Sequence, residues 1–497
     1  MTRSRLMQHG VLLLIGLGSG ARAHAALARV ILCDIPGQPT SLVPAATAGA
    51  TRYISFDRPY RSPDGSRWII SALTNTGNSN TDEVVIVGGG PTNAGAALLA
   101  QEGVTAVDSG RTIDSGSIDS KYGVNDGGVA VFTANLSGAT TDDECIVTGA
   151  SSSTLTVAIR EGAAIPALPG LSYGTTNTDP SIDNAGNVAV RTVGIIGGPA
   201  SDAACLRNGG TVLVARRNVT VPAGQAGGAT DAWQNLDATG FFVAENGPTL
   251  IQGDTVGAST SDDMVAVNGT VVIQEGQIIP GSGFASPVET DLEALMMTNG
   301  DWFVRGDNVD QLDWVVHNGV VVARTGAPIT PGSTELFDDA LFAATFFVMQ
   351  SNSVGDYVIG GVTTDPDPQH NSVIVKNGVT VVVRRGDPVD LDGNGLADDN
   401  AFIDTFNNDD SFLTDDGTYY FDADLRDSLG TIIGHGFLVL APPVCVGDLT
   451  GDGVTNESDL GALLANWLAG AGGDLSGDGQ TDESDLGILL GDWQCGA

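Results

Sequence analysis

The feature that most constrains the fold is an internal repeat through the middle of the chain. One element of the repeat is an apolar run, an Asn-Gly pair and a second apolar run, centred on Asn208-Gly209, Asn268-Gly269, Asn318-Gly319 and Asn377-Gly378. Asn-Gly can adopt positive φ at both central positions, as a type I′ hairpin turn requires. Earlier copies around Val84 and Cys145 have longer loops in its place. The repeat therefore predicts a series of β-hairpins.

A further strand follows each hairpin after an Asx or Gly turn. These strands are expected to begin at Trp68, Val129, Val188, Phe241, Trp302, Tyr357 and Tyr419. The spacing is about 59 residues, enough for four short strands, which is typical of one blade of a β-propeller. We expect an all-β propeller domain over residues 26–441.

The last copy of the repeat is short, and the start of the chain supplies a candidate for the missing half. The last copy contains Tyr419–Ala423 and Gly436–Leu440, then reaches Pro442-Pro443. The run from Arg29 resembles the third strand of other copies, and Arg52–Asp57 would be the fourth. A blade made by both ends of the domain closes the ring and removes exposed edges. We expect seven blades, with six or eight as the margin; an open β-solenoid is the alternative.

The N-terminus predicts export. Arg3 and Arg5 precede the apolar run Val11–Gly20, and Ala23-His24-Ala25 forms a small-x-small cleavage signal. Residues 1–25 are interpreted as a signal peptide. A membrane anchor, the alternative, needs about 20 apolar residues. We therefore expect a secreted or cell-surface protein with no membrane span.

The charge of the chain excludes one class of partner. Lys and Arg together number 21 against 60 Asp and Glu, a formal net charge of −39. Nucleic acid binding needs clustered cations, so no nucleic-acid partner is expected. An acidic chain is suited to divalent cations instead.

The C-terminal region contains a duplication with the spacing of calcium ligands. Residues 447–467 and 473–493 are near copies, and in both a Gly at loop position 6 permits a sharp turn. Six to eight oxygen ligands suit a hard cation, including a backbone carbonyl at position 7. The predicted ligands of the first loop are Asp448, Thr450, Asp452, Val454, Asn456 and Asp459. Those of the second loop are Asp474, Ser476, Asp478, Gln480, Asp482 and Asp485.

Each loop leads into a predicted helix with an apolar face. The face contains Leu460, Leu463, Leu464 and Trp467 in the first copy, and Leu486, Leu489, Leu490 and Trp493 in the second.

This pair of loop–helix units resembles a type I dockerin over residues 447–497, after a linker at 442–446. The resemblance implies two Ca²⁺ ions and docking to a cohesin-like or cell-surface protein. Loop positions 10 and 11 are Glu457-Ser458 and Glu483-Ser484, where cellulosomal dockerins often have Ser-Thr for cohesin contact. Calcium binding is thus better supported than pairing with a familiar cohesin. The resemblance also implies that the ends of the domain meet, which suits a disulfide between Cys445 and Cys495. With five cysteines the count is odd, and the pairing of Cys33, Cys145 and Cys205 stays open.

A third candidate calcium loop lies at 390–399, between strands of the sixth copy. Its predicted ligands are Asp390, Asp392, Asn394, Leu396 (through its carbonyl) and Asp398. Position 12 is Ala401, so the closing carboxylate is absent unless Asp399 replaces it. The alternative is a solvated turn.

Two motifs that suggest other chemistry are better explained by the repeat. The run Glu83–Gly95 resembles a dinucleotide fingerprint, with Gly88 and Gly90 at the first two glycine positions but Asn93 at the third, and it coincides with a hairpin of the repeat. The run Gly170–Gly174 matches a hydrolase elbow by letter, yet prolines precede it and no helix is expected to follow, so Ser172 is interpreted as a turn residue. We therefore predict no dinucleotide cofactor and assign no catalytic residue.

The leading hypothesis is a non-enzymatic binding or scaffold protein whose propeller presents a surface for a glycan or protein ligand. The first alternative is a polysaccharide-degrading enzyme, a glycoside hydrolase or lyase, with two carboxylates at one mouth of the propeller roughly 5–10 Å apart. The second is a structural surface-layer component that assembles on calcium addition.

Overall fold

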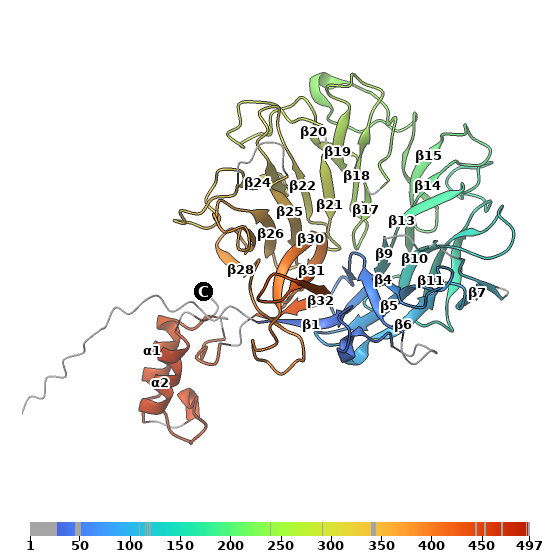
Figure 1. The fold of residues 1–497 in the computed structure, drawn as a ribbon. Helices are drawn as coiled ribbons and strands as arrows, with labels where there is room; N and C mark the ends of the chain where they lie inside the picture. Colours follow the sequence, from blue (N-terminus) through green and yellow to red (C-terminus); the bar gives the residue numbers. More distant parts are fainter. Residues whose placement is uncertain are drawn as a thin grey trace, which may run out of the picture. The chain divides into compact units, whose positions relative to one another are not determined.

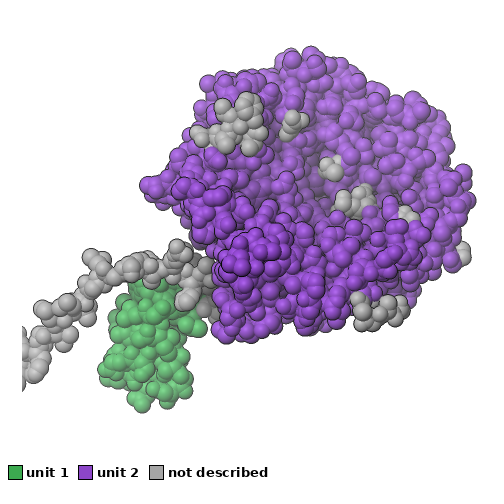
Figure 2. Space-filling model, in the orientation of Figure 1, with its two compact units in different colours: residues 1–25, 443–497 green, residues 26–442 purple. Residues whose placement is uncertain are grey.

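The computed structural model describes residues 27–44, 51–108, 110–114, 116, 118, 121–238, 240–290, 292–338, 344–442, 445–451, 454–468, 471–493 and 495. The predicted signal peptide lies outside these residues. The chain divides into two compact units, one spanning Ala26–Pro442 and the other containing Pro443–Ala497. Figure 2 draws the two units in different colours.

The described residues of the first unit form seven sheets around a central channel, each with four or five strands (Figure 1). The unit is a seven-bladed β-propeller, as the repeat predicts. Blade 1 contains β2 (Tyr53–Phe56), β3 (Tyr60–Arg61), β4 (Arg67–Thr74), β5 (Glu83–Gly89) and β6 (Ala97–Gln101). Blade 2 contains β9 (Tyr122–Val124), β10 (Ala130–Asn135), β11 (Glu144–Gly149) and β12 (Thr156–Arg160). Blade 3 contains β13 (Thr176–Ile182), β14 (Val188–Val193), β15 (Ala203–Arg207) and β16 (Val212–Arg216). Blade 4 contains β17 (Phe241–Val243), β18 (Thr249–Asp254), β19 (Asp263–Val267) and β20 (Thr270–Gln274).

The remaining blades follow the same order. Blade 5 contains β21 (Glu293–Met296), β22 (Trp302–Gly306), β23 (Trp314–His317) and β24 (Val320–Arg324). Blade 6 contains β25 (Phe346–Ser351), β26 (Tyr357–Val362), β27 (Ser372–Lys376) and β28 (Thr380–Arg384). Blade 7 contains β30 (Phe402–Leu413), β31 (Tyr419–Arg426), β32 (Ile432–Leu440), β1 (Ala28–Cys33) and β29 (Val389–Asp390). A separate pair joins β7 (Ala106–Asp108) and β8 (Arg111–Thr112), and short 3₁₀ turns cover Pro39–Ser41, Asn93–Gly95 and Ala226–Gly228.

The Asn-Gly pairs form the hairpins that the sequence predicts. Asn268 and Gly269 have φ of 50° and 76°, and Asn318 and Gly319 have 48° and 83°. The Asn also fixes the hairpin to the preceding strand, because Oδ1 of Asn318 accepts a hydrogen bond from the Trp302 amide. Each of these hairpins joins the third and fourth strands of a blade, counted from the channel.

The runs expected to follow each hairpin form the second strand of the next blade. The second strand begins at the expected residue at Val188, Trp302, Tyr357 and Tyr419. It begins within one residue of Trp68 and Val129, since β4 begins at Arg67 and β10 at Ala130. Phe241 is the exception, because it begins the short inner strand β17 and the second strand is β18. Two apolar runs lie close together in that blade, and the prediction used the first, Phe241–Val243, although the second strand is Thr249–Asp254.

Both ends of the domain build blade 7, but with a different division of strands from the one expected. β1 pairs antiparallel with β32 and is the fourth strand, not the third. Arg52–Asp57 is not in this blade, because β2 pairs with β4 in blade 1. The inner strand β30 has a bulge between Phe406 and Ser411, where four polar residues interrupt the apolar pattern. That interruption hid β30 in the sequence.

Neighbouring blades are held by apolar packing and by a series of hydrogen bonds at one end of the channel. Leu250 and Val265 of blade 4 pack in one cluster with Val304 and Trp314 of blade 5. The turns that follow the inner strands are linked from blade to blade. Asp64 N donates to Asp126, Asp126 N to Asn184, and Asn184 N to Glu245, over 2.9–3.0 Å. These links place the turns around the channel mouth in a fixed order.

The described part of the C-terminal unit contains two short helices, α1 (Glu457–Ala465) and α2 (Glu483–Gly491), and a 3₁₀ turn at Ala471–Gly473. Leu463 and Leu489 are fully buried, whereas Leu464 and Leu490 are about half exposed. The predicted apolar face is thus only partly covered within this unit. None of the described helices is long and apolar enough to cross a membrane.

Candidate functional site

The two acidic loops of the C-terminal unit fold alike, and in both a helix begins inside the loop. Asn456 caps α1 and Asp482 caps α2, each accepting a hydrogen bond from the backbone two residues on. The residue at loop position 12, Asp459 or Asp485, completes a capping box by accepting from the backbone N–H of the cap. Because the cap and the closing carboxylate belong to the predicted ligand set, the loop and the helix constrain each other.

The closing aspartates are buried and point back across their loops. Asp459 has no exposed surface, and its Oδ1 accepts hydrogen bonds from the amides of Leu449 and Thr450 at 2.9 and 3.0 Å. Burial by itself raises the pKa of Asp459, but the hydrogen bonds from Asn456 and Thr450 outweigh it and keep that pKa below its ordinary value. Asp485 accepts from Ser476 N in the same way. Both carboxylates are therefore held ionised.

The first aspartate of each loop shapes the turn that follows it. Asp448 Oδ1 accepts from Gly451 N at 2.7 Å. In the second loop Asp474 accepts from the amides of Gly477 and Gly479 at 2.7 and 2.8 Å. Oxygens of both loops, from carboxylate and hydroxyl groups, are of the kind that a hard cation prefers.

Three of the other predicted ligands make hydrogen bonds within their own loops. Thr450 Oγ1 donates to Asp459, Ser476 Oγ to Asp474, and Gln480 N to Asp478. Val454, at position 7, is half-buried. Asp452 lies outside the described residues.

A disulfide closes the C-terminal unit. Cys445 and Cys495 are bonded, with their Cα atoms 5.4 Å apart, which confirms the predicted pair. Asp492 reinforces the closure, since its Oδ2 accepts from Gly447 N and Thr455 Oγ1 at 2.7 and 2.8 Å. Cys33, Cys145 and Cys205 are buried free thiols.

The third acidic loop connects β29 to β30, the outermost and innermost strands of blade 7. Its hydrogen bonds match those of the second loop. Asp390 accepts from the amides of Gly393 and Gly395, which are loop positions 4 and 6. Asp474 accepts from the same two positions of the second loop. Asp392 accepts from Asn394 N, and Asn394 from Leu396 N. The loop thus has a regular set of internal hydrogen bonds.

Asp399 occupies the role of the closing carboxylate in this third loop. Its Oδ2 accepts from the amides of Leu391 and Asp392 at 2.7 and 3.3 Å, the positions from which Asp459 accepts in the first loop. Oxygens of Asp390, Asp392 and Asp399 lie within 4.8 Å of one another. Asn394 Nδ2 lies 3.4 Å from Asp398 Oδ1. Ala401, at position 12, is buried.

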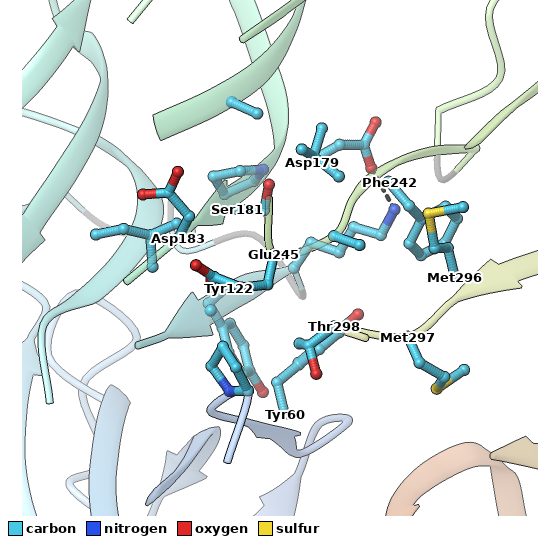
Figure 3. Close-up of a pocket in the computed structure, with 18 of the residues that line it drawn as sticks. Tyr60, Tyr122, Asp179, Ser181, Asp183, Phe242, Glu245, Met296, Met297 and Thr298 are labelled. Carbon is cyan, nitrogen blue, oxygen red and sulfur yellow. Dashed lines mark hydrogen bonds and ion pairs between the residues drawn. The ribbon is translucent and has the colours of Figure 1, made fainter. Parts of the chain in front are cut away.

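The propeller has a second candidate site that the sequence did not single out, a cavity of about 140 Å³ in the channel. All seven blades contribute lining residues, which include Tyr60, Tyr122, Ser181, Phe242, Met296, Gln350 and Ser411. In Figure 3, Tyr60 and Tyr122 lie together on one side, and Phe242 and Met296 lie together on another. The cavity is at the end of the channel where the inner strands lead into the linked turns.

A buried ion pair stands in the wall of this cavity. Lys121 Nζ lies 2.7 Å from Asp179 Oδ1 (dashed in Figure 3) and 4.0 Å from the centre of the Phe242 ring. Asp179 has φ of +54°, unusual for a residue other than glycine, and its side chain is fully buried. A bulge in β13 at this point turns the carboxylate toward Lys121.

Carboxyl groups with perturbed pKa values lie around the inner strand of blade 7. Burial raises the pKa of Asp410 to about 6, with neighbouring Asp409 and Asp57 adding to the effect and Arg58 opposing it. Burial, with Asp410, raises the pKa of Asp422 to about 8. Asp409, with φ of +54°, pairs with Arg305 at 2.9 Å. A comparison of the seven inner strands in sequence could have singled out Asn407–Asp410 and Thr176–Asp179 as polar interruptions.

The two rejected motifs are parts of the propeller. β5 and β6 pair antiparallel, so the glycine-rich run is a hairpin and not a βαβ unit. Gly88 lies opposite Trp68, where a Cβ would be 2.1 Å from the indole. Ser172 forms isolated bridges with Ala164 and Ile196 in a loop. Neither segment has the strand–turn–helix geometry of the enzymes it resembles by letter.

Comparisons with known proteins give only weak similarities, and the fold assignment rests on the structure itself. No family model and no curated protein matches the chain. Among solved structures, the Dos1 propeller is 12% identical, with 80% of each chain covered and a TM-score of 0.34. The WD40 propeller domain of Doa1 is 12% identical over 78% of this chain and 95% of that one, with a TM-score of 0.32. A protein of unknown function from Dyadobacter fermentans is 8% identical over 84% and 98%, with a TM-score of 0.30. At such values nothing about function follows for this chain.

Proposed function

We propose that this chain is an exported, non-catalytic binding protein whose propeller presents a ligand site and whose C-terminal unit binds calcium and docks to a partner. The observation that carries the proposal is the common geometry of loops 448–459 and 474–485, in which the first and last aspartates accept backbone N–H groups across the loop. Such hydrogen bonds fix the orientation of the first and last carboxylates of each loop, which lowers the entropic cost of binding an ion.

Calcium titration by isothermal calorimetry tests the calcium sites. We expect the mature chain to bind two Ca²⁺ ions in the C-terminal unit. Asp459→Ala and Asp485→Ala should each abolish one of them, because each removes a closing carboxylate. Glu457→Gln and Glu483→Gln, which alter exposed side chains outside the predicted ligand sets, serve as matched controls. Absence of Ca²⁺ uptake by the unaltered chain at millimolar Ca²⁺ contradicts this part of the proposal.

A third Ca²⁺ at residues 390–399 is part of the same proposal. Deletion of residues 444–497 should leave one site, and Asp399→Asn should abolish it in that shortened chain. Asp404→Asn, which alters a half-buried carboxylate of β30 outside the loop, is the control. A shortened chain that binds no calcium would show that Asp399 does not replace the missing carboxylate at position 12.

The docking role follows from the resemblance to dockerins, and the partner we propose is a cohesin-like or cell-surface protein. Deletion of residues 444–497 should release the protein from the cell fraction into the medium, and EDTA should do the same to the full chain. The pair Leu464 and Leu490 is the surface available for such a partner, because both are about half exposed on equivalent turns of the two helices. An unchanged distribution between cells and medium would exclude the anchoring role.

A second candidate function, polysaccharide cleavage, is favoured by one observation, the perturbed carboxyl groups of blade 7. A general acid needs a raised pKa and its partner an ionised carboxylate, and Asp422 and Asp410 have pKa values of about 8 and about 6. Release of reducing ends from a polysaccharide panel, lost on Asp422→Asn and on Asp410→Asn, would establish an enzyme. No release across the panel leaves binding as the function.

A further inference from the structure

The cavity in the channel combines an apolar wall with buried polar groups. Tyr60, Tyr122, Phe242 and Met296 provide the wall. A cavity of about 140 Å³ is close to an engineered cavity of ~150 Å³ that holds one benzene molecule. The occupant is therefore the size of a single ring.

The cavity concentrates positive charge in a chain of formal net charge −39. Arg58, Arg61, Lys121 and Arg207 all line it. The acidic lining residues are already engaged. Asp179 pairs with Lys121, Asp183 accepts from Asn187, and Glu245 accepts from Asn184. Outside the lining, Asp409 pairs with Arg305, and Asp409, Asp410 and Glu293 also interact electrostatically with Arg58.

Several buried donors of the lining have no acceptor among the residues that the structure describes. They are Nε2 of Gln350, Nη2 of Arg61, Nε of Arg58 and Nε of Arg207. Gln350 is 3% exposed and Arg61 is 7% exposed. A buried donor left without a partner destabilises the folded state, so four such groups in one cavity point to a missing acceptor. No lining carboxylate has a buried oxygen in the same condition.

Two of these donors belong to blades that flank blade 7. Arg58 lies between β2 and β3 of blade 1, with its guanidinium carbon 5.3 Å from the centre of the Tyr60 ring. Gln350 lies on β25 of blade 6, which packs against β30 of blade 7. An arginine and an amide on the two blades that flank blade 7 suit a carboxylate, whose two oxygens offer about four acceptor positions.

We propose that the channel cavity binds a small organic monocarboxylate built on a single ring, such as a uronic acid, with its carboxylate held by Arg58 and Gln350 and its ring against Tyr60, Tyr122 and Phe242. This rests on the proposed function, in which the propeller presents the ligand site. It adds the chemical class of the ligand.

Isothermal calorimetry with the intact mature chain tests the proposal. The probes are glucuronate and benzoate, their neutral counterparts glucose and benzyl alcohol, and inorganic phosphate. We expect at least one carboxylate to bind at least tenfold more tightly than its neutral counterpart and than phosphate. Arg58→Gln and the near-isosteric Gln350→Leu should each weaken that carboxylate at least tenfold. Arg324→Gln, which alters an exposed arginine of blade 5 outside the cavity, should leave it unchanged.

Other outcomes overturn the proposal. Equal binding of the neutral counterpart means that the cavity recognises the ring and not the carboxylate. Equal binding of phosphate means a general anion site. Failure of both carboxylates to bind at millimolar concentration rejects the class. Thermal melts of the variants separate lost recognition from lost folding. Calcium titration of the same samples is independent, so failure of the carboxylate site is distinguishable from failure of the calcium-dependent function.

Discussion

At the scale of single residues, the channel is built from charged groups in unusual states. Asp179 and Asp409 both have φ of +54° within inner strands, and each places a buried carboxylate beside a cation. Left-handed backbone at a residue other than glycine costs free energy, which the ion pairs help to offset. Asp422 is buried with its Oδ1 unpartnered among the described residues. These states make the channel sensitive to single substitutions and to pH.

The Asp422 carboxyl should make the propeller less stable as pH rises. Its pKa is raised to about 8 in the folded chain, against an ordinary value of 3.8. The folded state thus holds a proton that the unfolded state releases, and stability falls between about pH 4 and pH 8. Asp422→Asn mimics the protonated form. At pH 8 we therefore expect its Tm to exceed that of the unaltered chain by about 2–4 °C or more. At pH 4 the two chains should melt alike. Melts in EDTA at both pH values measure this, and a parallel pH dependence of the two chains would contradict it.

The Lys121–Asp179 pair should behave as a coupled unit. Asp179→Asn removes the buried carboxylate 2.7 Å from the Lys121 ammonium, and breaking a buried pair costs about 3–5 kcal/mol. The double variant Lys121→Met with Asp179→Asn removes both charges and should recover most of that loss. Urea unfolding of the two single variants and the double variant gives the coupling energy. Additive losses would mean that the pair contributes little.

At the scale of elements, close contacts between strands decide which residues are tolerated. Gly88 on β5 lies directly opposite Trp68 on β4, and the Trp68 indole donates to Gly90 O at 3.1 Å. The indole therefore occupies the space that a side chain at position 88 would need. Gly95, in the turn of the same hairpin, has no comparable contact, since a Cβ there would meet only Gly89 O at 3.8 Å.

Gly88→Ala should destabilise blade 1, whereas Gly95→Ala should not. A Cβ at position 88 would lie 2.1 Å from the Trp68 ring, so the indole must move. Overpacking of this kind costs about 1–3 kcal/mol. Chemical denaturation followed by tryptophan fluorescence measures both variants. Equal stability of Gly88→Ala and the unaltered chain would show that Trp68 has room to move.

At the scale of the whole molecule, the two compact units have different sources of stability. The propeller is closed by pairing of β1 with β32, which joins segments about 400 residues apart. The C-terminal unit has few buried side chains, and the Cys445–Cys495 disulfide closes a loop of 50 residues. We therefore expect the units to unfold separately.

Replacement of Cys445 and Cys495 by serine should destabilise only the C-terminal unit. A disulfide across a loop of this length contributes about 4 kcal/mol by the chain-entropy model. In EDTA, calorimetry should show the smaller transition move to lower temperature or vanish while the propeller transition stays. Excess calcium should partly restore the smaller transition, because ions bind only the folded loops. A shift of both transitions would mean that the units unfold together.

The sequence by itself determined the blade repeat, the Asn-Gly hairpins, the closure by both ends and the Cys445–Cys495 pair, because these depend on periodic patterns or on chain ends. Only the tertiary structure decided which strand closes blade 7, since β30 is interrupted by Asn407–Asp410 and β2 lacks a distinctive pattern. It also showed that Asp399 accepts hydrogen bonds from the amides of Leu391 and Asp392, and it revealed the channel cavity. Residues such as Arg58 and Gln350 are nearly 300 positions apart. No local sequence pattern predicts that both line one cavity, because only the closed ring of seven blades brings blades 1 and 6 to either side of blade 7.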